Sequence, residues 1–315
     1  MIRKAAIVSL SGFVLTRSEI SILKKEKPWG IILFKRNIQS ENQVINLTKK
    51  IRNMMKDKKY PILIDEEGGR VSRLSNFINN SYYNQKYIGD IYKLDKRIGT
   101  KFCKTYIDSL SKILVKIGIN INTTPVLDLL KKNTHRVIGN RSYSNNPLIV
   151  NELGKLCVNF YKKNKIATVI KHIPGHGGAN LDSHFKLPKV KDTFKSLEKK
   201  DFKCFKNISS FFAMTAHILY THLDKKNNAT HSKIIIKKII RKEIGFKGIL
   251  ISDDISMKAL NYNIIKNADL ALKAGCNLVL YCAGKTKEMN KLLNSTPYID
   301  KFTAKKTSEF YKFLS

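Results

Sequence analysis

The chain has 315 residues, of which 43% are apolar, and it carries a formal net charge of +35 with a pI near 10.0. This length can bury a large core, and it suits one α/β barrel as well as two smaller domains. No apolar run is long enough to cross a bilayer, and the five cysteines form no CxxC pair, which argues against a membrane protein, a disulfide framework and a zinc site.

The basic residues are spread along the whole chain and do not gather into one patch. Lys greatly outnumbers Arg, and Asn and Ile are abundant, as A+T-rich codons would produce, so we interpret the charge as compositional drift. A polyanion partner is the alternative, since a strongly basic chain attracts nucleic acid and anionic lipid. Nucleic-acid recognition would need a basic patch interleaved with aromatic residues. We therefore expect no specific nucleic-acid partner and no membrane partner. We also expect the protein to be a monomer.

The first apolar run, residues 5–15, follows two basic residues and superficially resembles a short signal peptide. Two serines and a glycine interrupt the run, and no small-residue cleavage site follows it. We therefore predict a first β-strand here, a helix that opens at residues 16–19, and a cytoplasmic location.

Short β-rich runs alternate with longer amphipathic stretches along the chain. The predicted strands are 6–14, 30–34, 62–65, 119–127, 168–171, 212–215, 248–252 and 278–281. The predicted helices are 41–56, 101–117, 148–164, 232–244, 264–274 and 285–293. Eight strand–helix units without a linker or repeat predict a closed (β/α)8 TIM barrel, one domain over residues 1–315. An open doubly wound sheet is the alternative, but no G-x-G-x-x-G motif follows the first strand.

Ionisable residues stand at or just after the ends of five of these strands. They are Asp65, Asp128, Lys171 with His172, His217, and Asp253 with Asp254. In a closed barrel the carboxyl ends of all strands meet at one rim, where active sites are assembled. The sequence therefore predicts a functional site at this rim.

The segment 65–73 reads DEEGGRVSR and begins where the third strand ends. Its glycine pair allows a sharp turn beside a ligand, and Asp65 and Arg73 are suited to bind opposite sides of one polyhydroxylated molecule. The alternative is a salt-bridged turn, and we expect Arg70 to form such a structural ion pair.

Two carboxylates, Asp253 and Asp254, follow the seventh strand. Adjacent strand residues point to opposite faces, so we expect one carboxylate to face the barrel axis and the other to bind backbone or a neighbour. A helix N-cap is the alternative, more so for Asp254 than for Asp253.

The segment 170–178 reads IKHIPGHGG, and Asp182 and His184 follow it. The histidines His172, His176 and His184 are candidate metal ligands, but their spacing does not match HExxH and a metal-bound imidazole cannot readily donate a proton. In an extended segment Asp182 and His184 lie on one face, where the carboxylate can orient the imidazole for proton transfer. We therefore favour an Asp182–His184 dyad and expect neither a metal nor a cofactor.

These segments resemble glycoside hydrolase family 3, specifically the bacterial β-N-acetylhexosaminidases of peptidoglycan recycling. The matching stretches are GIILFKRN at 30–37, IDEEGGRV at 64–71, TPVLD at 124–128, IGNRSY at 138–143, KHIPGHG at 171–177, DSH at 182–184, MTAH at 214–217 and SDDISMK at 252–258. They follow the family's order over nearly the whole chain, and the KH…PGHG…DSH block is the most specific of them.

The resemblance implies a TIM barrel that removes non-reducing terminal β-linked N-acetylglucosamine, from fragments of the N-acetylglucosaminyl-anhydromuropeptide type, with retention of configuration. Asp253 matches the family's nucleophile, and His184 matches the general acid/base, with Asp182 as its partner in place of the usual second carboxylate. The sugar-binding positions match Asp65, Arg73, Arg141, Lys171 and His172. Glu66 stands where the family usually has Gln, and Asn140 replaces an acidic residue.

Two other functions stay open from the sequence. A β-N-acetylglucosaminide phosphorylase is one, because a neutral imidazole repels an incoming phosphate less than a carboxylate would. The other, from a different class, is a basic, non-catalytic relative that binds polyanions.

Overall fold

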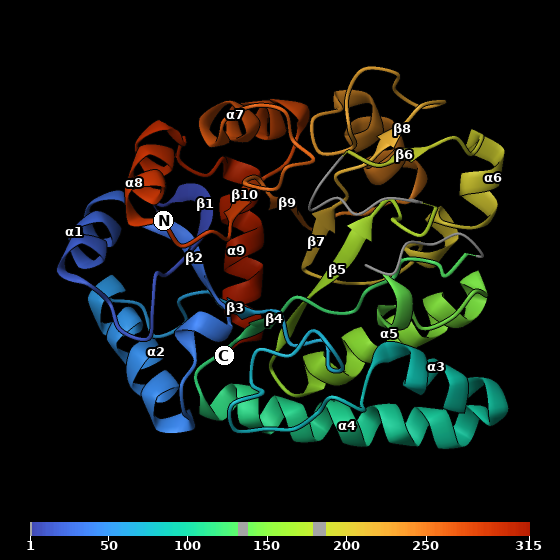
Figure 1. Cartoon of the computed structure of the whole chain (residues 1–315), viewed down its shortest axis with the longest axis horizontal. Helices are drawn as coiled ribbons and strands as arrows, with labels where there is room; N and C mark the ends of the chain where they lie inside the picture. The colour runs from blue at the N-terminus through green and yellow to red at the C-terminus, as the bar shows by residue number, and fades with distance from the viewer. Residues whose placement is uncertain (1, 132–137, 179–186) are drawn as a thin grey trace.

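The structure, a computed structural model, describes residues 2–131, 138–178 and 187–315, and Figure 1 shows the arrangement of its elements. Within these ranges eight parallel strands close into a barrel in the spatial order β1-β10-β9-β7-β5-β4-β3-β2. The strands are β1 (Lys4–Ser9), β2 (Pro28–Leu33), β3 (Ile62–Ile64), β4 (Ile121–Asn122), β5 (Ala167–Ile173), β7 (Phe212–Thr215), β9 (Ile249–Asp254) and β10 (Leu278–Tyr281). Each overlaps one predicted strand, so the predicted (β/α)8 TIM barrel is confirmed.

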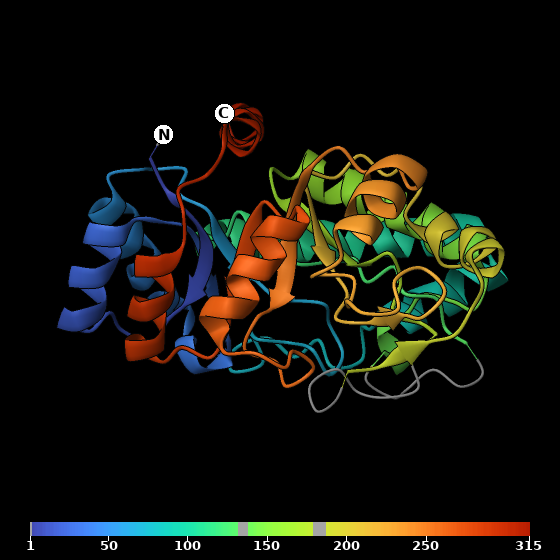
Figure 2. The same cartoon turned by 90° about the horizontal axis from the view of Figure 1, so that it is seen from above.

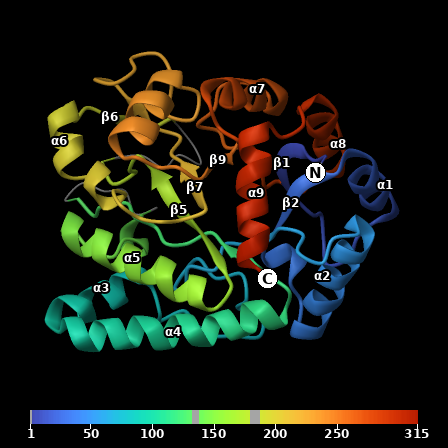
Figure 3. The same ribbon diagram turned by 180° about the vertical axis from the view of Figure 1, so that it is seen from behind.

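Helices surround the barrel, as Figures 1 and 3 show from opposite sides. They are α1 (Arg17–Glu26), α2 (Glu41–Met55), α3 (Gln85–Leu94), α4 (Lys96–Lys116), α5 (Pro147–Lys163), α6 (Phe194–Lys199), the π-helix η4 (Ile235–Glu243), α7 (Ile264–Ala274), α8 (Thr286–Ser295) and α9 (Lys301–Phe313). A separate two-stranded sheet pairs β6 (Lys189–Val190) with β8 (Leu219–Tyr220). None of the helices in the described ranges has the length and apolar character that crossing a bilayer requires.

Side chains that bond to unpaired backbone N–H groups fix where the helices begin. Before α1, the Thr16 hydroxyl accepts from the Glu19 N–H at 3.1 Å, and the Glu19 carboxylate accepts in return from the Thr16 N–H at 2.9 Å. Before α5, the Asn146 side chain accepts from the Leu148 N–H at 2.9 Å, and Pro147 lies in the first turn of the helix. The helix predicted to open at residues 16–19 is confirmed.

Several element boundaries differ from the prediction. The first strand ends at Ser9, because the N–H of Ser11 donates to the carboxylate of Glu19 at 2.8 Å and the chain leaves the barrel there. Helix α4 begins before the predicted residue 101, and α3, α6 and α9 were not predicted.

The fourth strand is also shorter than predicted, with two residues in place of the range 119–127. Pro125 has no N–H to donate to a ladder, so regular pairing stops before it. Beyond this point the chain still follows β5 through single bonds: the Lys171 N–H donates to the Pro125 carbonyl at 3.1 Å, and the Leu127 N–H donates to the Lys171 carbonyl at 2.6 Å. These bonds keep the segment at the barrel rim.

Helix α9 closes the end of the barrel at which the strands begin, where Figure 2 shows both chain termini. Phe310 of this helix is fully buried, and its ring centroid lies 5.3 Å from that of Phe212 and 6.5 Å from that of Trp29. The Trp29 indole N–H donates to the Thr307 hydroxyl at 2.9 Å, which satisfies its one polar atom. The aromatic cluster therefore fills the opening that a barrel of eight strands leaves at this end.

The substitution Phe310→Ala is expected to lower the free energy of unfolding by about 4 kcal/mol, because it leaves a cavity that rigid rings cannot refill. Denaturant unfolding measures this loss. Phe302 on the same helix is 40% exposed, so Phe302→Ala is the matched control and should cost less than about 1 kcal/mol. Equal losses in the two variants would show that α9 is not held by its buried ring.

Candidate active site

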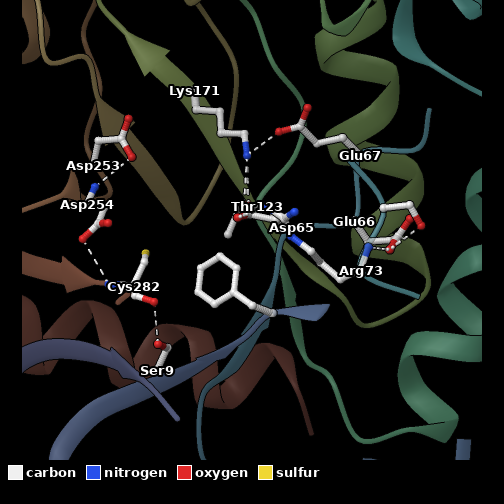
Figure 4. A network of polar contacts seen from close by, with 12 residues as sticks. Ser9, Asp65, Glu66, Glu67, Arg73, Thr123, Lys171, Asp253, Asp254 and Cys282 are labelled. Carbon is white, nitrogen blue, oxygen red and sulfur yellow. Dashed lines mark hydrogen bonds and ion pairs between the residues drawn. The ribbon is translucent and has the colours of Figure 1, made fainter. Parts of the chain in front are cut away.

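Lys171 lies at the centre of the predicted rim, between two acidic side chains (Figure 4). Its side chain is 3% exposed, and its ammonium lies 3.1 Å from Asp65 Oδ1, 2.6 Å from Glu67 Oε1 and 3.1 Å from the Thr123 hydroxyl. A buried ammonium needs such partners, because its charge loses the solvation of water. Lys171 thereby joins the end of β5 to the segments that follow β3 and β4.

Asp65 is bound by two cations. The Arg73 guanidinium donates to Asp65 Oδ2 at 3.2 Å, and the Thr123 hydroxyl also donates to this carboxylate. Burial alone would raise the pKa of Asp65, but Lys171 and Arg73 hold that pKa well below its usual range. Asp65 and Arg73, predicted on opposite sides of a ligand, therefore form an ion pair with each other on one wall of the site.

Glu67 is a charged group of this wall, and no role was predicted for it from the sequence. It accepts from Arg141 Nε at 2.7 Å and from Arg141 Nη2 at 2.8 Å, a two-pronged pair that fixes the guanidinium. Despite burial, Arg141 and Lys171 lower the pKa of Glu67 to about 2. The sequence feature that could have identified Glu67 is its place in the acidic run before the glycine pair. The Arg70 guanidinium, expected in an ion pair, donates to the Ile138 carbonyl at 3.4 Å.

His172 is held by Asp128, which the sequence placed at the rim without a role. The His172 ring Nδ1 lies 2.7 Å from Asp128 Oδ2, and the N–H groups of His172 and His176 donate to Asp128 Oδ1 at 3.2 and 2.7 Å. Burial opposes ionisation of Asp128, but His172 keeps the pKa of this carboxyl below its usual value. An ionised Asp128 fixes the proton on Nδ1, so a ligand of this ring would bind at Nε2.

The two aspartates at the end of β9 have different partners, as predicted. Asp254 binds backbone: its Oδ1 accepts from the N–H groups of Ser256 and Cys282, both at 3.1 Å. Asp253 Oδ1 accepts from the Asp254 N–H at 2.8 Å. The N-cap alternative is wrong for both, because the next helix, α7, is capped by Asn263.

Asp253 is held in its ionised form. Burial alone would raise the pKa of its carboxyl, but His172, His217 and Lys171 lower it below the ordinary aspartate value. His217, also at the predicted rim, is buried, and burial lowers its pKa. Its Nε2 lies 3.0 Å from the Asp254 carbonyl, which can only accept, so the neutral ring carries its proton there.

The strands that bear these groups are irregular where the groups stand. Between Lys171 and Ile173, β5 has one residue more than its partner β7, and that residue is His172. Between Ile251 and Asp254, β9 has one residue more than β10. An extra residue bends a strand and turns a side chain to a new direction, and such bulges are frequent beside active sites.

Two predicted residues, Asp182 and His184, lie outside the described residues. His176, the remaining histidine of the loop, is buried, and burial lowers its pKa to about 4. Within the described ranges, no group of three or more His, Cys, Asp or Glu side chains is arranged to hold a metal ion.

Known proteins are similar to this chain in sequence and in fold. A family model described as glycosyl hydrolase family 3 N terminal domain matches residues 6–301. A β-hexosaminidase of Neisseria gonorrhoeae is 34% identical over 290 residues, which cover 89% of this chain and 78% of that protein. One of Shewanella frigidimarina is 32% identical over 285 residues, with coverages of 88% and 81%. The crystal structure of NagZ from N. gonorrhoeae in complex with N-trifluoroacetyl-D-glucosamine has a TM-score of 0.89 at 30% identity, covering 100% of this chain and 90% of that one.

The buried Glu67 pair gives a stability prediction. Its folded pKa of about 2 is below the ordinary value of about 4.3, so its stabilisation is complete above about pH 4.3 and is lost as the pH falls towards 2. Glu67→Gln should therefore lower the free energy of unfolding by about 3 kcal/mol at pH 7 and by progressively less below pH 4.

Denaturant unfolding of the wild type and the variant across this pH range tests the prediction. The control is Asp90→Asn, which removes an ion pair to Lys86 in which the Asp90 side chain is 55% exposed, and should change stability by less than about 0.5 kcal/mol. A Glu67→Gln loss that does not change with pH would contradict the assignment.

Proposed function

Because the chain belongs to glycoside hydrolase family 3, we propose that it is a retaining exo-β-N-acetylglucosaminidase. It removes non-reducing terminal N-acetylglucosamine from peptidoglycan-derived fragments, of the N-acetylglucosaminyl-anhydromuropeptide type. In this proposal residues 1–315 act as one catalytic domain and as a monomer, in the cytoplasm, within cell-wall recycling. The substrate class is supported by the β-hexosaminidase relatives and by the N-acylglucosamine bound in the structurally similar NagZ.

The observation that carries the proposal is an ionised carboxylate at the mouth of the barrel. Burial opposes this form, but the Asp254 N–H and the positive charge of Lys171 are among the groups that lower the pKa of Asp253 below the ordinary aspartate value. A nucleophile must be deprotonated to attack, and a carboxyl with such a pKa is deprotonated across the neutral pH range. Asp253 is therefore the proposed nucleophile.

The reaction then has two displacements at the anomeric carbon. In the first, an oxygen of Asp253 forms a bond to this carbon while the bond to the leaving oxygen breaks, and His184 gives its proton to that oxygen. In the second, His184 takes a proton from water, the water oxygen bonds to the anomeric carbon, and Asp253 is released. Asp182 orients the His184 ring through both steps, in the role that its place in the motif gives it.

The wall opposite Asp253 is proposed to hold the sugar through Asp65, Arg73, Arg141, Lys171 and His172. Each of the three cationic side chains of this wall, Arg73, Arg141 and Lys171, is paired with a carboxylate, Asp65 or Glu67. Balanced charges with many hydrogen-bonding atoms suit a neutral, hydroxylated ligand. This balance disfavours the polyanion-binding alternative, in which cations would be left unpaired.

A release assay tests the proposal. The protein should cleave an aryl β-N-acetylglucosaminide and leave the matching β-glucoside almost unchanged. Asp253→Asn should lower kcat by more than about 10³-fold, because the amide is not a nucleophile. Preference for the glucoside, or an active Asp253→Asn variant, would overturn the proposal. If the product in phosphate buffer is the sugar 1-phosphate in place of the free sugar, the enzyme is a phosphorylase.

The role of His184 has a separate test. His184→Ala should lower kcat by about 10²–10⁴-fold on a disaccharide, whose alcohol leaving group needs protonation. An aryl glycoside with an acidic phenol should lose far less in the first step. Turnover of the two substrates by the wild type and the variant gives the comparison, and an equal loss on both would refute general acid catalysis by His184.

A further inference from the structure

Three acidic residues follow β3, and the middle one has surroundings of a different kind. Asp65 and Glu67 are each bound by two cations. Glu66 is fully buried, and among the described residues its side chain accepts hydrogen bonds from neutral donors. A buried carboxylate without a neighbouring cation is unfavourable unless hydrogen bonds from the protein replace those it would make with water.

The Glu66 carboxylate collects donors from the loop that carries Arg73. Its Oε2 accepts from the N–H groups of Arg73 at 2.7 Å and Leu74 at 3.0 Å, and from the Ser72 hydroxyl at 3.3 Å. Its Oε1 accepts from Asn80 Nδ2 at 2.7 Å. One side chain thus binds four groups spread over residues 72–80, and Figure 4 shows it beside Arg73.

The backbone of Glu66 is itself fixed to the barrel. Its N–H donates to Asn122 Oδ1 at 3.0 Å, and its carbonyl accepts from Asn122 Nδ2 at 2.9 Å. Asn122 is a buried residue of β4. The position of the Arg73 backbone is therefore set relative to the barrel through Glu66, and the Arg73 guanidinium reaches Asp65 from there.

We propose that Glu66 is a positioning residue for sugar binding, which acts by accepting the backbone N–H of Arg73 and so holds the Arg73–Asp65 pair in the sugar-binding wall. The inference rests on the proposed function, in which this pair contacts the sugar. Glu66 itself touches neither the sugar nor the reacting atoms, so its effect is on substrate affinity.

What the loop requires from Glu66 is acceptor oxygens at one place, and the negative charge is dispensable. Burial raises the pKa of Glu66, which means that the fold disfavours its charge. A glutamine has the same shape and retains one oxygen for Ser72, Arg73 and Leu74. Its amide N–H₂ can donate to Asn80 once that amide is turned over, since Asn80 Oδ1 has no hydrogen-bond partner among the described residues.

Three substitutions separate geometry from charge. Glu66→Ala removes the acceptors, and Glu66→Asp keeps the charge but withdraws the oxygens by one methylene. Both should raise KM for an aryl β-N-acetylglucosaminide and Kd for N-acetylglucosamine by about tenfold, with kcat changed by less than about threefold. Glu66→Gln should stay within about threefold of the wild type in both constants and have an equal or higher Tm at pH 7, because it removes a disfavoured buried charge.

The matched control is Asn76→Ala, which removes a bond from the same loop to the Ile38 carbonyl without touching Glu66, and it should leave KM unchanged. A merely structural role would lower the active fraction, and hence the apparent kcat, at constant KM. That pattern, or a Glu66→Gln variant as impaired as Glu66→Ala, would overturn the inference. If Glu66→Ala does not fold, the Asp and Gln variants decide it. If the wild type neither cleaves the glycoside nor binds the sugar, the proposed function itself fails.

Discussion

The buried ammonium of Lys171 is the constraint on which the rim depends. A cation with 3% of its side chain exposed must be surrounded by acceptors, and here they are Asp65, Glu67 and the Thr123 hydroxyl. Because Lys171 contacts these acceptors, the segments after β3 and β4 lie against the end of β5. Glu67 then holds Arg141 by two hydrogen bonds, so one buried charge orders a wall built from four separate parts of the chain.

Asp253 gains from this arrangement without direct pairing to a cation among the described contacts. The positive charge of Lys171 acts on it through space in an environment of low polarity, where charges interact strongly, and the Asp254 N–H donates to it. Direct pairing would stabilise the carboxylate further but would occupy the oxygen that attacks in the proposed mechanism. Local strand irregularities in β5 and β9 give the side chains their directions. The ion pairs that hold the wall together are thus separate from the interactions that keep the proposed nucleophile ionised.

The two ends of the barrel differ in composition: one is apolar and packed, and the other carries the charged residues of the candidate site. Where the strands begin, α9 packs Phe310 against Trp29 and Phe212, and this end is apolar and closed. Where the strands end, the side chains are charged and bound to one another, and Glu66 fixes the loop that bears Arg73. Each buried charge at this second end is unfavourable unless it is paired or hydrogen-bonded.

The sequence by itself determined the barrel, since eight apolar runs separated by amphipathic stretches can bury their faces together in few ways, and it placed the ionisable residues at the strand ends. It also pointed to the pair Asp253 and Asp254 at a strand end, and the family resemblance then singled out Asp253 and the KH…PGHG…DSH block. Only the tertiary structure decided the partners: that Asp128 binds His172, that Glu67 binds Arg141 and Lys171, and that Asp254 binds the Cys282 N–H. These contacts join residues far apart in the chain, and two of the strands involved contain an extra residue that a period-two pattern cannot register.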